Sequence, residues 1–173
     1  MTKRASLASS ALLLGAVMLL LFWINSVRDS DDSIISMPWP AQVAFHGVMN
    51  LLLAAGLVWF AMHLNLSGWQ RVTWQVGAGM ASVGIWVNYP LMAAGLILVG
   101  VAEIASARNR GAGVALISGS LCWFAVWLRG ARFDSEDSLP LDSLERLLST
   151  AGLVLIVLGI LALGINGLRA GRV

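Results

Sequence analysis

The chain has 173 residues, of which 58% are hydrophobic and 12% charged, and its formal net charge is +2. Soluble domains carry about 25% charged residues, so this composition excludes an ordinary soluble protein and indicates an integral membrane protein. The charge is too small and too dispersed for nucleic-acid binding, and a single cysteine, Cys122, excludes an intrachain disulfide. The long uncharged runs predict one all-α, multi-pass helical bundle formed by residues 1–173.

The first apolar run covers roughly residues 6–27 and follows the basic residues Lys3 and Arg4. It begins like a signal peptide, but Phe22-Trp23-Ile24-Asn25 comes after it in place of a small-x-small cleavage site. We therefore predict a retained transmembrane helix. By the positive-inside rule the basic start places the N-terminus in the cytoplasm. We expect the membrane to be a bacterial inner membrane.

A second helix is expected from about 40 to 64, because Pro38-Trp39-Pro40 suits the first turn of a helix at a membrane interface. The next apolar stretch, about 73–106, would make a helix of about 50 Å, longer than a bilayer core of about 30 Å. Asn88-Tyr89-Pro90 lies in its middle. The stretch is therefore either one tilted helix kinked at Pro90 or two short helices that meet at a tight turn.

Two more helices are expected, one over about 111–128 and one that follows a capping box at Asp142 and Glu145 and runs to about 168. Five spans would leave the basic tail at Arg169 outside, against the positive-inside rule. Six spans would bring it inside, but each arm of the hairpin at Pro90 would have only about 16 residues, fewer than a usual span. We favour five spans with a kinked third helix and keep six as the alternative.

Polar residues form a stripe on the second predicted helix. Gln42, His46 and Asn50 are spaced i, i+4 and i+8, which places them on one helix face. His46 can bind a metal or haem, or transfer a proton, near neutral pH. Polar groups at membrane depth either mark a functional site or join helices through hydrogen bonds. The sequence leaves both interpretations open.

A second polar cluster is formed by Trp86, Asn88 and Tyr89. These side chains either cap the backbone where the third helix is interrupted or complete a pocket with the second helix. Glu103 precedes Arg108 by about one helical turn, so we expect it to act as a structural anchor that either snorkels to the interface or pairs with Arg108. The familiar sequence motifs of hydrolases and nucleotide-binding proteins are absent.

Several short segments resemble a known family. Gly47-Val48-Met49-Asn50, followed by Gly56-Leu57-Val58-Trp59, is similar to the GVMNG…GLxW segment of the hydroxylaminobenzene mutases. Trp86-Val87-Asn88 resembles a GWSN-like segment of the related styrene oxide isomerases, and Gly167-Leu168-Arg169 resembles the end of the last helix of the mutases. The resemblance covers about residues 40–95 and the last helix.

These relatives are small integral membrane isomerases with four helices. In the styrene oxide isomerases a histidine of the second helix binds haem b, whose iron acts as a Lewis acid on the epoxide oxygen, and the proteins form trimers. Asn50 matches the family asparagine, and Trp86 and Asn88 match the pair on the third helix. The family histidine falls at Ala44, whereas His46 is four residues before Asn50. Either His46 replaces the ligand through a local shift, or no haem is bound.

The resemblance implies a membrane isomerase acting on a small hydrophobic substrate that carries oxygen, an aromatic epoxide or an aryl hydroxylamine. A homo-oligomer in the lipid bilayer is expected, a trimer if the resemblance holds. The alternative is a non-catalytic membrane subunit or assembly protein whose polar stripe joins helices, so enzymatic activity stays open. The expected site comprises His46 as haem-iron ligand, Asn50 and Asn88 as catalytic residues that orient the substrate, and Gln42, Trp86 and Tyr89 as pocket lining.

Overall fold

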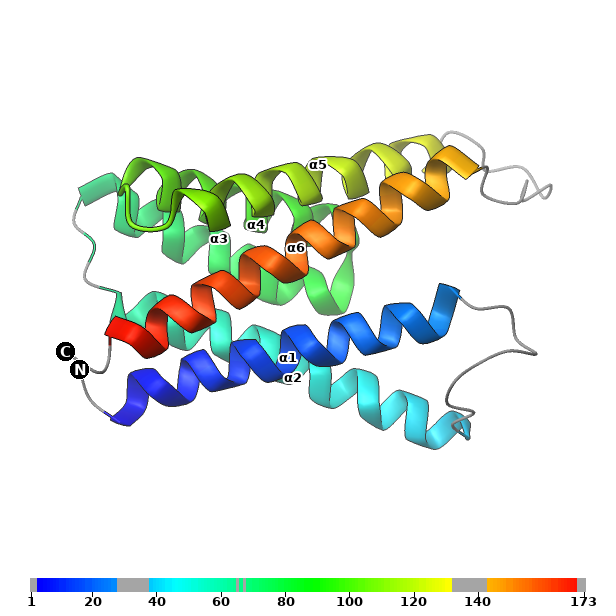
Figure 1. Cartoon of the computed structure of the whole chain (residues 1–173), viewed down its shortest axis with the longest axis horizontal. Coiled ribbons are helices and arrows are strands. Elements are labelled where there is room, and N and C mark those ends of the chain that lie inside the picture. Colours follow the sequence, from blue (N-terminus) through cyan, green and yellow to red (C-terminus); the bar gives the residue numbers. More distant parts are fainter. Residues whose placement is uncertain (1–2, 28–37, 65, 67, 132–142, 171–173) are drawn as a thin grey trace.

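The computed structural model describes residues 3–27, 38–64, 66, 68–131 and 143–170, and it is built from α-helices (Figure 1). The helical bundle that the sequence predicts is therefore confirmed, and the helix ends lie within a few residues of those expected. The described residues form six helices: α1 (Lys3–Val27), α2 (Trp39–His63), α3 (Gly68–Val87), α4 (Tyr89–Ala105), α5 (Arg110–Ala131) and α6 (Ser143–Ala170). Asp142 lies outside the described residues, so the capping box is not tested.

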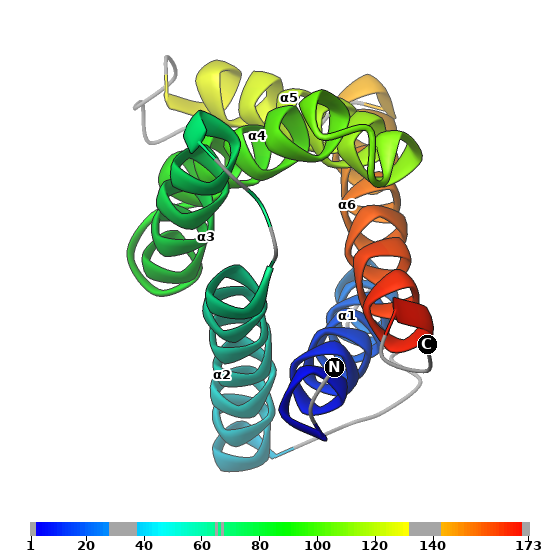
Figure 2. The same cartoon turned by 90° about the vertical axis from the view of Figure 1, so that its left-hand side faces the viewer.

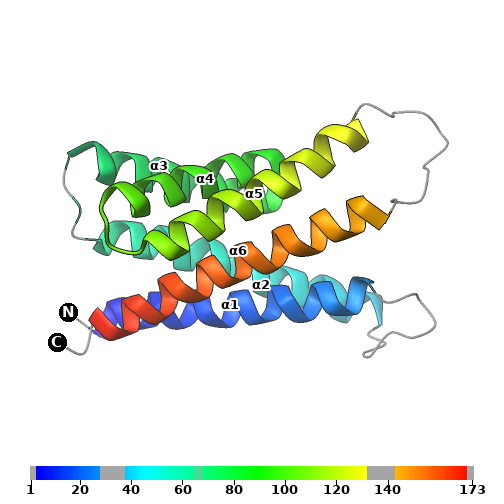
Figure 3. The same cartoon turned by 45° about the horizontal axis from the view of Figure 1, so that its top comes forward.

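The helices form a closed ring in chain order. Each described helix packs against the helices before and after it in the sequence, and α6 returns to pack against α1. Figure 2, which looks along the helices, shows this ring around a central space. Successive helices run antiparallel, so both ends of the chain lie at the same end of the ring (Figures 1 and 3). We call this the terminal end and the other the distal end.

The long apolar stretch in the middle of the chain is two helices, so the expectation of one kinked third helix is wrong. Helix α3 ends at Val87, Asn88 is extended with φ −166° and ψ 122°, and α4 begins at Tyr89 with Pro90 in its first turn. Proline lacks the N–H that would continue the helix and suits a first turn. The chain reverses at this point, and α3 and α4 form an antiparallel hairpin (Figure 3).

Glycines explain why the hairpin forms. A Cβ atom added at Gly84 would overlap the backbone of Met92, and one added at Gly95 would overlap the backbone of Ala81. At Gly77 an added Cβ would lie 2.7 Å from the carbonyl oxygen of Gly95. Small residues allow two helix backbones to approach closely. The hairpin uses this glycine face, which a single straight helix would leave without a partner.

The outside of the ring is strongly apolar. Three helical segments are long and apolar enough to cross a membrane, namely Pro40–His63, Arg110–Leu128 and Leu144–Arg169, and two shorter apolar helices cover Ser6–Phe22 and Tyr89–Ala105. Large apolar side chains are exposed on the outer surface of each helix; they include Leu7, Leu51, Val72, Val101, Val114 and Leu147. Apolar exposure on this scale marks a surface that contacts something other than water.

Candidate ligand-binding cavity

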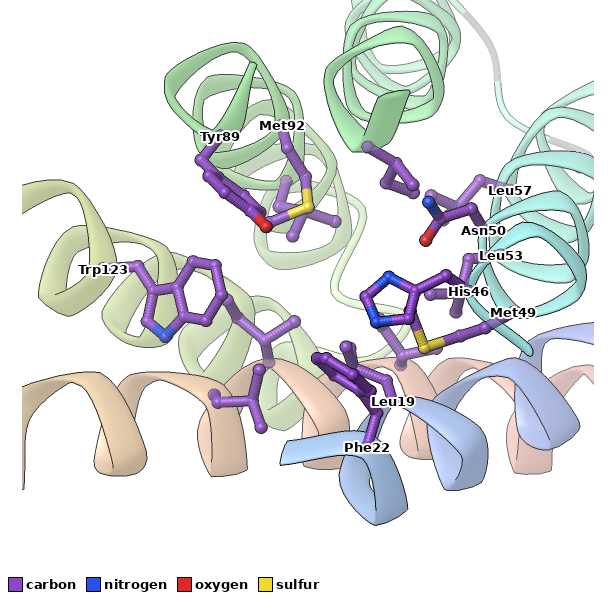
Figure 4. A pocket seen from close by; sticks show the side chains of 15 residues that line it. Leu19, Phe22, His46, Met49, Asn50, Leu53, Leu57, Tyr89, Met92 and Trp123 are labelled. Carbon is purple, nitrogen blue, oxygen red and sulfur yellow. The ribbon is translucent and has the colours of Figure 1, made fainter. Parts of the chain in front are cut away.

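A cavity of about 120 Å³ lies inside the ring, toward its distal end (Figure 4). We call it the inner cavity. All six described helices contribute to its lining, which is mostly aliphatic, aromatic and methionine side chains. The lining comprises Leu19, Phe22, His46, Met49, Asn50, Leu53, Leu57, Ile85, Tyr89, Met92, Leu96, Trp123, Leu153, Ile156 and Ile160.

Three polar side chains interrupt this apolar lining. His46 and Asn50 extend from one face of α2 toward Tyr89 and Met92 of α4 (Figure 4). Within the described part of the chain, the ring nitrogens of His46, the amide of Asn50 and the hydroxyl of Tyr89 make no hydrogen bond. His46 and Asn50 are partly buried and Tyr89 is 60% exposed, so these polar groups are open to water or to a small polar ligand.

Aromatic contacts hold the walls of the inner cavity in place. The rings of Phe22 and His46 meet edge to face with centroids 3.9 Å apart, which ties α1 to α2. Tyr89 meets Trp123 in the same way at 5.4 Å. The indole Nε1 of Trp123 donates a hydrogen bond of 2.8 Å to the carbonyl oxygen of Ser149, which joins α5 to α6. Tyr89 is 60% exposed, so it stands at the distal mouth of the cavity.

A second, larger hollow of about 480 Å³ adjoins the inner cavity. We call it the outer groove. It is lined by Phe22 of α1, by Trp86 of α3 and by a run of α2 residues, Gln42, Val43, His46, Gly47 and Asn50. Phe22, His46 and Asn50 line both hollows. The two spaces therefore meet at the polar side chains.

The structure brings together most of the residues that the sequence singled out. His46 and Asn50 line both hollows, Gln42 and Trp86 line the outer groove, and Tyr89 lines the inner cavity. Asn88 is the exception, because it is exposed and lines neither of them. Asn88 precedes α4 as its N-cap residue but makes no side-chain capping hydrogen bond.

Sequence reasoning missed the aromatic walls. Phe22 and Trp123 come from helices α1 and α5, which lie far from α2 in the sequence, and no spacing pattern relates them to His46. Trp123 is one of eight tryptophans, which the sequence alone suggests are interfacial side chains. Only the closure of the ring shows that Trp123 faces inward.

A second polar cluster lies near the terminal end and is satisfied internally. Glu103 is 0% exposed and forms an ion pair with Arg108, one of the two arrangements that the sequence predicted. The indole Nε1 of Trp74 donates a hydrogen bond of 2.8 Å to Glu103. The guanidinium of Arg108 lies 5.4 Å from the centroid of the Phe60 ring. This cluster joins α2, α3 and α4, and its internal pairing contrasts with the unpaired groups of the inner cavity.

The haem that the resemblance implies is larger than the inner cavity, whose 120 Å³ is near the volume of about 150 Å³ that holds benzene. The outer groove adds about 480 Å³ beside the same histidine, so haem binding stays a prediction. A metal-bound histidine usually donates its second N–H to a fixed acceptor, whereas His46 has no such partner among the described residues.

Fold and cavity together define a ring of helices that encloses a small, mostly apolar cavity. Comparison of the chain with protein-family models, with curated proteins and with solved structures finds no match. The resemblance to the mutases and isomerases therefore stays a prediction, and the site is interpreted from its own geometry.

Proposed function

We propose that this protein lies in a membrane, binds a small apolar molecule carrying oxygen inside its helical ring, and isomerises it. The observation that carries the proposal is the group of unpaired polar atoms on His46, Asn50 and Tyr89 in an otherwise apolar cavity of about 120 Å³. Sites for small molecules are typically apolar with a few convergent polar groups that fix orientation. An aromatic epoxide or an aryl hydroxylamine with one ring has an apolar ring for the lining and an oxygen for the polar groups.

The polar groups of the inner cavity support isomerisation. Such a reaction needs no co-substrate, only groups that stabilise the developing charge and transfer a proton. Breaking a C–O or N–O bond builds negative charge on oxygen, which the amide N–H of Asn50 and the hydroxyl of Tyr89 can stabilise. His46 is the group in this cavity that can transfer the proton.

The distribution of charge supports a membrane location with both termini in the cytoplasm. By sequence, the terminal end has seven of the 11 basic residues and one acidic residue, Glu103, and the distal end has the other four and eight acidic residues. An excess of Lys and Arg marks the cytoplasmic side. Six spans follow, in a bacterial inner membrane. The basic residues of the terminal end are Lys3, Arg4, Arg71, Arg108, Arg110, Arg169 and Arg172.

Binding is tested with two probes that differ at one group. The protein is placed in lipid nanodiscs, and ¹⁹F NMR compares 4-fluorophenol with 4-fluorotoluene, in which a methyl group replaces the hydroxyl. We expect saturable binding with a preference for 4-fluorophenol. Asn50→Leu should weaken 4-fluorophenol about tenfold, the value of one hydrogen bond, and leave 4-fluorotoluene unchanged. The matched control is Asn166→Leu on α6, which lines neither hollow. Absence of saturable binding would end the proposal.

Catalysis is tested on an aryl epoxide and an aryl hydroxylamine, with the rearranged product measured by chromatography. His46→Gln should lower kcat at least 100-fold, because general acid–base groups contribute about 10²–10⁴-fold.

An absorption spectrum of the purified protein, oxidised and then reduced with dithionite, tests the haem prediction. A Soret band that disappears in His46→Ala would identify His46 as a haem ligand.

The alternative function, a non-catalytic membrane subunit, is favoured by one observation. The edge contact of His46 with Phe22 already joins α1 to α2, so the histidine has a packing role. If that is its only role, His46→Ala should lower the midpoint of unfolding in detergent and leave probe binding unchanged. Light scattering on the same two proteins measures the proposed homo-oligomer, a trimer by the resemblance.

A further inference from the structure

We infer that the ligand reaches the inner cavity from the lipid, sideways through the outer groove between α2 and α3. This inference rests on the proposed function and adds the route by which a membrane-dissolved molecule arrives. It starts from a local separation of two helices that pack closely elsewhere.

The hydroxyl of Ser82 on α3 donates a hydrogen bond of 3.2 Å to the carbonyl oxygen of Ala54 on α2, so the two helices touch at that level. Gly47 lies seven residues before Ala54 and hence, at 3.6 residues per turn, on the same side of α2. A Cβ atom added at Gly47 would have nothing within 4 Å. Helices α2 and α3 therefore separate toward the distal end, and the outer groove occupies the space between them.

The outer groove leads directly to the polar side chains of the inner cavity. Phe22, His46 and Asn50 line both spaces, so a molecule that passes from one to the other keeps its oxygen within reach of the same donors. The exposed part of the groove is mostly apolar, with Val43 51% and Trp86 55% exposed beside the polar Gln42. This surface suits a molecule that arrives dissolved in lipid.

The opening lies at membrane depth in the proposed orientation. Gly47 is eight residues from Trp39, the first residue of α2, which corresponds to about 12 Å along the helix. A position so far inside a spanning helix faces the hydrocarbon core, which is about 30 Å thick. An apolar one-ring molecule partitions into the bilayer, and the lateral route meets it there.

Gly47→Leu tests the route because it should fill the groove without disturbing the fold. The new side chain meets no protein atom at its Cβ, and replacing glycine within a helix favours the helix, so the melting temperature should be unchanged or higher. The matched control is Gly79→Leu on α3, where an added Cβ also has nothing within 4 Å and which lines neither hollow.

Exchange of 4-fluorophenol is measured in nanodiscs by ¹⁹F saturation transfer. In Gly47→Leu we expect the association and dissociation rates both to fall at least tenfold while Kd stays within twofold, because a blocked path slows both directions equally. Gly79→Leu should exchange like the wild type. Trp86→Ala, which widens the groove, should accelerate exchange.

Three outcomes would overturn the inference. If Gly47→Leu binds and exchanges like the wild type, the ligand passes through the distal mouth instead. If Kd rises in Gly47→Leu while the dissociation rate does not fall, the outer groove holds the bound ligand and is not a path to it. If the wild type shows no saturable binding, the proposed function fails and the route fails with it. Normal binding with unaltered exchange removes only the route.

Discussion

The polar side chains inside the ring form two clusters that differ in their hydrogen bonding. At the terminal end, the carboxylate of Glu103 has an ion pair with Arg108 and a hydrogen bond from Trp74. At the distal end, His46 and Asn50 line an apolar cavity and make no hydrogen bond within the described residues. A fully paired buried group such as Glu103 serves structure, whereas partly buried polar groups that line an apolar cavity are available to a ligand. The two clusters should therefore respond to mutation in opposite ways.

Arg108→Met should destabilise the fold without a specific effect on the cavity. It leaves the buried carboxylate of Glu103 without its counterion. Because Arg108 is 36% exposed and Trp74 still donates to the carboxylate, we expect a cost of about 1–3 kcal/mol. Unfolding in detergent, monitored by circular dichroism, measures the loss. Arg110→Met, at an exposed position in the first turn of α5, is the control and should be nearly neutral. An Arg108→Met protein as stable as the wild type would mean that the pair contributes little.

Tyr89→Phe should weaken the ligand and leave the fold intact. It keeps the ring that packs against Trp123 and removes only the hydroxyl. Loss of one hydrogen bond worth about 0.5–1.5 kcal/mol lowers the affinity for 4-fluorophenol about threefold to tenfold, measured by ¹⁹F titration. Equal affinity in Tyr89→Phe and wild type would show that the hydroxyl does not reach the ligand.

Asn88→Ala tests a role that the resemblance implies and the cavity lining does not support. Asn88 is exposed and lines neither hollow, so we expect turnover and affinity to change by less than twofold. The same epoxide and hydroxylamine assays measure this. A large fall in kcat would reinstate Asn88 as a catalytic residue.

At the scale of helices, the sequence located the break between α3 and α4 but not its form. Pro90 and Asn88 correctly marked an interruption. The usual length of a membrane span then favoured one kinked helix, because α4 has only 17 residues. The stronger information was the set of glycines at 77, 84 and 95, which permit backbone contact between antiparallel helices. The usual span length is a property of one helix, whereas the glycines indicate how closely α3 and α4 pack against each other.

Gly95→Ala should weaken the α3–α4 hairpin. The added methyl group would overlap the backbone of Ala81, and backbone atoms cannot move aside as the tip of a side chain can. Overpacking of this kind costs about 1–3 kcal/mol, measured as a lower midpoint of unfolding in detergent. Gly79→Ala on the same hairpin has open space and should stabilise it by about 0.5–1 kcal/mol. Equal midpoints for the two variants would show that the helices do not pack this closely.

At the scale of the molecule, the helices could be predicted and their closure into a ring could not. Hydropathy and proline positions gave the ends of α1, α2 and α5 within a few residues. The stripe of His46 and Asn50 was also visible, because it depends only on spacing within α2. The inner cavity depends on α6 returning to α1, which brings Phe22 and Trp123 to the same space. No local pattern encodes that contact.

The ring predicts that the chain crosses the membrane an even number of times. Since its six helices run alternately up and down, both termini lie at one end (Figure 1), whereas five spans would separate them. We expect a C-terminal green fluorescent protein fusion to fluoresce in bacterial cells and a C-terminal alkaline phosphatase fusion to be inactive. A phosphatase inserted between residues 132 and 142 should be active, because the distal end carries the acidic segments.

The decisive comparison is a charge reversal that changes orientation and not the fold. Changing Lys3, Arg4, Arg169 and Arg172 together to Glu removes four of the seven basic residues of the terminal end. The positive-inside rule then no longer favours that end, and a fraction of the phosphatase reporters should exchange their activities. If the wild-type C-terminus instead proves periplasmic, an odd number of spans is required. The α3–α4 hairpin could not then cross the membrane twice, and the lateral opening beside Gly47 would need a new position relative to the lipid.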